Sequence, residues 1–148
     1  MQDIDNGYKK IVEELNKFNT GKVIIYIDDK AIYPNGMKVD IIAMLMEYGE
    51  EEFDVAFPAR PFFRSAFDPH IDDLNNLMEK CVDKITEGNL TARKAFEKMG
   101  KEAVKYVKES IMNGYYAPLA ESTVKAKGSD KPLYDTGTLV RSVKYKIE

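Results

Sequence analysis

The chain has 148 residues, 44% of them hydrophobic and 32% charged, which is typical of a folded globular protein. This length suits one domain, residues 1–148. A formal net charge of −3 disfavours tight electrostatic binding to nucleic acid or to anionic lipid. Cys81 is the only cysteine and His70 the only histidine, which excludes an intramolecular disulfide and a Cys/His zinc site within one chain.

The first ten residues are polar, with neither a charged segment nor an apolar core of the signal-peptide kind. No apolar run elsewhere approaches the length that spans a membrane. We therefore expect a protein that is neither secreted by a signal peptide nor embedded in a membrane. A single cysteine fits a reducing cytosol.

The first half of the chain predicts two helices and a strand. Apolar residues from Tyr8 to Phe18 recur at three- and four-residue steps, which predicts a helix that ends before Gly21. The β-branched run at 23–27 predicts a strand covered on both sides, with the first helix as one cover. A loop or hairpin tip at 29–39 precedes a short helix that Gly49 ends.

Residues 53–57 follow as a short predicted strand, and Pro61 suits the first turn of a short helix over 59–67. Asp68 is the predicted N-cap of the next helix, with Pro69 at its first position.

That helix carries an apolar stripe from Ile71 to Ile85 and ends at Gly88. Thr91 is the predicted N-cap of the longest helix, which Gly114 ends. The alternating residues 142–147 predict a half-buried last strand. Together these elements predict an α+β fold, in which a small antiparallel or mixed sheet packs against several helices, including a long antiparallel helix pair.

The most enzyme-like motif is Asp135-Thr136-Gly137, the tripeptide with which retroviral-type aspartic proteases present one carboxylate of a dyad. That fold needs a flap hairpin and a second turn after the aspartate, and only 11 residues follow Gly137. The favoured interpretation is local: Asp135 or Thr136 caps a short helix through Leu139 and Val140, and Gly137 eases the turn.

No other pattern nominates an active site. The loop from Lys127 to Lys131 lacks the spacing of a phosphate-binding loop, and the acidic pairs have no metal-binding spacing. Arg60 and Arg64 are expected to pack their stems or to form an ion pair between subunits. Cys81 lies on an apolar stripe, where a thiol is an inert small hydrophobe. We therefore expect no catalytic residues, no cofactor and no metal.

Two ordered blocks of motif resemble a known family. The first is Glu47-Tyr48-Gly49 followed, after a spacer, by the run from Pro58 to Arg64, which reads Pro-Ala-Arg-Pro-Phe-Phe-Arg. The second runs from Pro118 to Tyr145 as Pro-Leu-x-x-Ser-Thr, Lys-Gly-Ser and Lys-Pro-Leu-x-Asp-Thr-Gly-x-Leu, then a serine before a short strand.

These blocks resemble the neck and tail-completion (virion morphogenesis, head-tail joining) family of long-tailed bacteriophages. Ala117 and Glu121 stand where prolines are usual, and Tyr134 replaces an aliphatic residue, which leaves the subgroup open.

The resemblance implies a structural protein that forms a homo-oligomeric ring at the head-to-tail junction of a phage or prophage particle. Its partners would be the head-side connector and the tail terminator or tail-tube proteins. It would reach the virion after assembly in the host bacterial cytoplasm, and DNA would pass through without sequence-specific binding. The interface residues we expect from aromatic, arginine and loop content are Arg60, Pro61, Phe62, Phe63, Lys127, Gly128, Lys131, Pro132, Asp135, Thr136 and Gly137.

Two alternatives come from other classes of protein. One is a generic intracellular adaptor or oligomerisation protein that shares the fold. The other is a hydrolase centred on Asp135, which a peptidase activity lost in Asp135→Asn would reveal.

Overall fold

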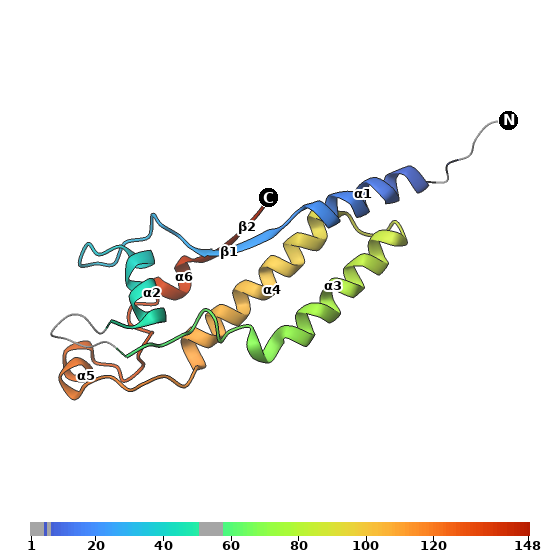
Figure 1. Ribbon diagram of the computed structural model, residues 1–148. Helices are drawn as coiled ribbons and strands as arrows, with labels where there is room; N and C mark the ends of the chain where they lie inside the picture. The colour runs from blue at the N-terminus through green and yellow to red at the C-terminus, as the bar shows by residue number, and fades with distance from the viewer. Residues whose placement is uncertain (1–4, 6, 51–57) are drawn as a thin grey trace.

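A computed structural model describes residues 5, 7–50 and 58–148 and gives the chain an α+β fold, as the sequence predicts. Figure 1 shows the elements in chain order: α1 (Tyr8–Thr20), β1 (Val23–Ile27), α2 (Val39–Tyr48), the 3₁₀ turn η1 (Asp68–His70), α3 (Ile71–Thr86), α4 (Ala92–Asn113), α5 (Glu121–Lys127), α6 (Thr138–Ser142) and β2 (Val143–Ile147). The strand predicted at 53–57 lies outside the described residues. None of the helices in the described ranges is long and apolar enough to cross a membrane.

The sheet is antiparallel, with a register that runs from Val23 opposite Ile147 to Ile27 opposite Val143. Helix α4 packs against the face that carries Val143, which is 2% exposed, and Tyr145. The opposite face carries exposed lysines at 144 and 146. The last strand is therefore half-buried, as predicted.

Helix α1 does not cover β1, so this part of the prediction was wrong. It packs against α3 and α4 instead, and β1 is half-exposed along its length. The reason lies at the end of α1, where the Phe18 ring stacks on Phe96 of α4 with 5.0 Å between centroids. At Gly21 a Cβ atom would lie 2.6 Å from the Phe96 ring, so the chain turns there in close contact with α4.

Helices α3 and α4 form the predicted antiparallel pair (Figure 1). Thr91 is the N-cap of α4, since its Oγ1 accepts a hydrogen bond from the backbone N–H of Lys94 at 3.3 Å. The cap predicted at Asp68 was wrong: residues 68–70 form a 3₁₀ turn, and α3 begins at Ile71 without a side-chain cap. His70, with φ −119°, breaks the helical path between the two.

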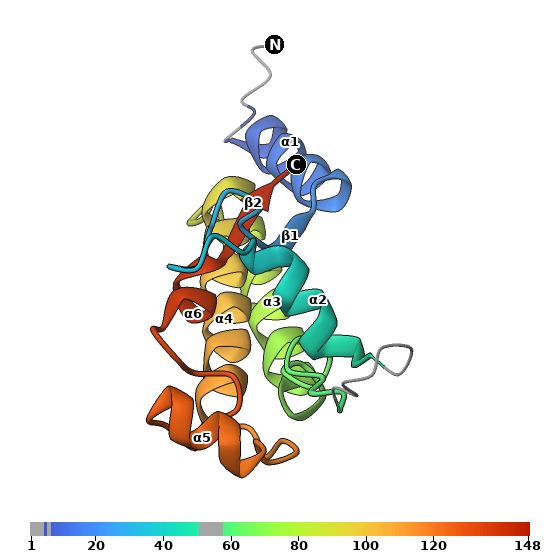
Figure 2. The ribbon, with the colours of Figure 1, turned by 90° about the vertical axis from the view of Figure 1, so that its left-hand side faces the viewer.

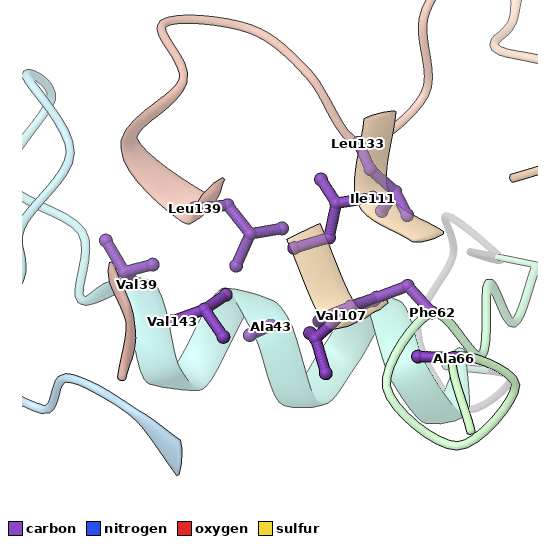
Figure 3. Packing of buried hydrophobic residues seen from close by; sticks show 9 residues of the cluster. All are labelled: Val39, Ala43, Phe62, Ala66, Val107, Ile111, Leu133, Leu139 and Val143. Atoms are coloured by element: carbon purple, nitrogen blue, oxygen red, sulfur yellow. The ribbon is translucent and has the colours of Figure 1, made fainter. Parts of the chain in front are cut away.

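The larger hydrophobic core lies along the C-terminal half of α4 and joins segments that are far apart in the sequence. Figure 3 shows how α2, the 58–67 segment, α4, the loop before α6, α6 itself and β2 contribute to it. Its buried members are Val39, Ala43, Phe62, Ala66, Val107, Ile111, Leu133, Leu139 and Val143. The C-terminal third of the chain is thereby packed against the segment that starts at Pro58.

Three local predictions need correction or addition. Residues 62–67 form turns rather than a short helix. Helix α6 has Gly137 at its N-cap, with φ 73° and no side-chain cap, so Asp135 and Thr136 do not cap it. Helix α5 was not predicted, and Figure 2 shows it at the opposite end of the molecule from α1.

Candidate functional site

Glu47 joins the two parts of the first motif block. It lies on α2 with 5% of its surface exposed, and its carboxylate accepts the backbone N–H groups of Phe63 at 2.8 Å and Arg64 at 3.0 Å. The Arg64 side chain adds an ion pair to the same carboxylate at 2.9 Å and lies over the Tyr48 ring, 5.1 Å from its centroid. Of these two backbone donors, only the Arg64 N–H would bond within a helix that starts at Pro61, so Glu47 takes the first N–H group that such a helix would use.

Arg60 joins the first block to the second. The residue is 3% exposed, and its guanidinium donates from Nε to the carbonyl of Ala117 at 3.0 Å and from Nη2 to that of Pro118 at 3.4 Å. Its own N–H donates to the Met46 carbonyl at 2.7 Å. Burial lowers the pKa of Arg60, since the charged form loses hydration. Arg60 thus connects α2 to the segment at Ala117 and Pro118, which leads into α5, through buried hydrogen bonds.

A pocket of about 590 Å³ lies where these segments meet. Its lining is mainly apolar with polar side chains interspersed, which is the usual composition of a site that receives another molecule. The residues that line it come from three parts of the chain: Tyr33, Asn35, Met37, Ile42 and Met46; Pro58 and Arg60; and Pro118, Leu119, Ala120, Thr123, Lys127, Pro132, Leu133, Asp135, Thr136, Thr138 and Leu139.

The polar groups of the pocket influence one another. Partial burial lowers the pKa of Lys127, and the nearby Asp135 carboxylate opposes that effect. The Lys127 ammonium donates to the carbonyl of Lys131 at 3.1 Å, which closes the loop at Gly128, where φ is 70°. Burial, reinforced by the Asp135 charge, raises the pKa of the Tyr33 hydroxyl.

Five of the predicted interface residues line the pocket, namely Arg60, Lys127, Pro132, Asp135 and Thr136, and the predicted residues differ in exposure. Gly128, Lys131, Asp135 and Thr136 are exposed. Pro61, Phe63, Lys127 and Pro132 are half-buried. Arg60, Phe62 and Gly137 are buried within the chain, so their side chains or backbone support the site from beneath rather than forming its outer surface.

The potential metal ligands, the cysteine and the histidine of the described residues lie as follows. No group of three or more His, Cys, Asp or Glu side chains in the described ranges is arranged to hold a metal ion. Cys81 is 2% exposed, and burial raises the pKa of its thiol, in line with an inert core residue. His70 stacks on the Tyr106 ring, 3.9 Å between centroids, which engages the imidazole in packing.

Sequence reasoning missed Glu47 and Tyr33 as site residues. Glu47 is the only carboxylate on the inward side of an otherwise apolar helix, and a buried acid at such a position needs donors, which is the signal that would have found it. Tyr33 lies in a loop whose sequence carries no such signal.

Comparison with known proteins adds no relative: no family model, curated protein or solved structure matches the chain.

Proposed function

We propose that the chain is a structural subunit of the head-to-tail junction in a long-tailed phage, a prophage or a related tail-like particle. In this role it forms a homo-oligomeric ring that joins the head-side connector to the tail terminator or tail tube, and it works in the virion without catalysis.

One observation supports this proposal above the others. The two motif blocks that resemble the neck family meet at one place, because Glu47 binds the 63–64 backbone and Arg60 binds the carbonyls of Ala117 and Pro118. The pocket that results is lined by residues of both blocks. The hydrogen bonds between the two motif blocks fix the shape of the surface around the pocket. An assembly subunit needs such a defined surface to bind its neighbour.

The charge of the chain agrees with a passage for DNA. With 25 acidic and 22 basic residues, the subunit has no excess of cations with which to hold phosphates. Each phosphate that a protein neutralises strengthens its binding to DNA, so a mildly acidic conduit lets DNA slide.

The test is inactivation of the gene in the phage or prophage that encodes it, with negative-stain imaging of the lysate. We expect filled heads and complete tails that remain separate, and joined particles when the gene is supplied from a plasmid. Joined, infectious particles without the gene would refute the proposal.

The same complementation separates assembly from hydrolysis. Asp135→Asn keeps the size of an exposed side chain at the pocket edge and replaces its carboxylate by a neutral amide. We expect this variant to restore joining fully, whereas a hydrolase centred on Asp135 would lose its function.

A further inference from the structure

The hydrogen bonds of the sheet fix which backbone groups point outward. Lys22 and Glu148 exchange both backbone hydrogen bonds, at 2.7 and 3.0 Å, and the N–H of Asp28 donates to Ser142 at 2.8 Å. In an antiparallel pair the hydrogen-bonded positions alternate with positions that are not bonded to each other. The outward N–H and C=O groups therefore belong to the positions in between, which are Val23, Ile25 and Ile27 on β1 and Val143, Tyr145 and Ile147 on β2.

These two rows are the edges of the two-stranded sheet, and both are open along their length except at Val143, which is 2% exposed and covered by the core. Within the described part of the chain, no hydrogen-bond partner is found for any of these outward backbone groups. A strand edge of this kind is a ready template for an extended strand of another chain. Sheets of two strands also gain stability when further strands are added.

The side chains beside the two edges differ in charge, which selects between possible pairings. The face not packed on α4 carries Lys144 and Lys146 on β2 and Ile24 and Tyr26 on β1. Two β2 edges placed together would bring lysines beside lysines, which is unfavourable. A β2 edge beside a β1 edge repeats the pattern already present within the chain, where Lys146 is opposite Ile24 and Lys144 is opposite Tyr26.

We propose that the β1 edge of one copy pairs antiparallel with the β2 edge of the next copy, so that the sheet continues from subunit to subunit. This inference rests on the ring proposed above and locates its contact. A contact between two different surfaces of the same chain is heterologous, and such contacts close into a ring when the rotation between neighbours allows it.

Residue-resolved hydrogen exchange on the assembled and monomeric species tests the pairing. We expect the amides of Val23, Ile25, Ile27, Tyr145 and Ile147 to exchange at least tenfold more slowly in the assembly than in the monomer; Val143, which is 2% exposed, is left out of the comparison. The amides of the inward positions, such as Ile24 and Lys146, should be protected in both. Outward amides that exchange equally in both species, or are already protected in the monomer, would overturn the proposal.

A pair of variants at Val23 separates the effect of the backbone N–H at the strand edge from the effect of the side chain. Val23→Pro removes one outward N–H at the first position of a strand, where proline is tolerated, while Val23→Ala shortens the side chain and keeps the N–H. We expect Val23→Pro to weaken assembly about five- to tenfold for each contact and Val23→Ala to weaken it far less. Equal effects of the two would overturn the proposal.

Two further results would also overturn it. One is a dimer in which only the β1 amides gain protection, since this means that two β1 edges pair. The other is a chain that stays monomeric at millimolar concentration. Neither result decides the head-to-tail role, which the complementation experiment tests on its own.

Discussion

The backbone N–H of Phe63 donates to the Glu47 carboxylate at 2.8 Å, although the two residues are 16 positions apart in the sequence. This bond fixes the segment that begins at Pro58 against α2. It also places the Phe62 ring, 1% exposed, in the core beside Val107 and Leu133. A buried carboxylate thus fixes both a turn and a core side chain.

Replacement of Glu47 by alanine is expected to destabilise the chain by about 3 kcal/mol, because it strands two backbone N–H groups and removes a buried acceptor. Most of this comes from the backbone donors, since the Arg64 side chain is 58% exposed and its ion pair is screened by water. Urea denaturation measures the change. Glu121→Ala, at an exposed glutamate, is the matched control and should cost less than about 0.5 kcal/mol.

The sequence predicts best where one periodic pattern decides the structure. The apolar stripe of α4 and the Thr91 N-cap predicted that helix correctly, because both signals depend only on neighbouring residues. The turn at 62–67 was missed, since Pro61 suits a helix start and the distant Glu47 takes the Arg64 N–H group that such a helix would use. Likewise the sequence predicts Arg60 as an interface residue at the surface, because its acceptors, the carbonyls of Ala117 and Pro118, lie far away along the chain.

Gly100 of α4 faces the Tyr145 ring of β2, and a Cβ atom at this position would lie 2.4 Å from that ring. Glycine to alanine in a helix normally gains about 1 kcal/mol. Here we expect Gly100→Ala to lose about 1–2 kcal/mol instead, because the added carbon pushes the strand away from the helix. Thermal or urea unfolding measures it.

A double-mutant cycle with Tyr145→Leu shows whether the ring is the cause. In that background Gly100→Ala should become neutral or stabilising, as at an ordinary helical position. A loss of equal size in both backgrounds would place the clash elsewhere.

Cys81 should resist thiol reagents in the folded chain. It is 2% exposed, so a reagent cannot easily reach the sulfur. Burial also raises the pKa of its thiol above the ordinary value, so little of the reactive thiolate is present. We expect reaction with a disulfide reagent at pH 8 to be at least about a hundredfold slower than in 6 M urea, because it requires opening of the structure. Ser122→Cys, which adds an exposed thiol on α5, serves as the control and should give an immediate burst of one equivalent.

Asp28 and Lys144 tie the end of β1 to β2 through an ion pair. The hydrogen bond from Lys144, and then that from the Lys30 N–H, lowers the pKa of Asp28 below its ordinary value. A carboxyl whose pKa is lower in the folded state stabilises the fold above its unfolded pKa, about 3.9, and loses this effect as the pH falls through the folded pKa.

The free energy of unfolding should therefore fall less in acid for Asp28→Asn than for the parent chain. This difference in free energy between variant and parent should be smaller in 1 M salt. Unfolding monitored from pH 6 to pH 2 measures this. Asp29→Asn, at the exposed neighbour, is the control for the loss of one negative charge in this loop.

Arg60→Lys tests whether one guanidinium holds the two motif blocks together. Lysine keeps the charge, but its single nitrogen cannot donate along both directions that Nε and Nη2 take to Ala117 and Pro118, so at least one carbonyl loses its donor. We expect a loss of about 2 kcal/mol in stability and faster amide exchange over α5 than over α4. Arg93→Lys, whose side chain is 83% exposed, provides the control and should change neither quantity. If Arg60→Lys loosened α4 and α5 alike, Arg60 would be stabilising the whole core rather than tying the second block to the first.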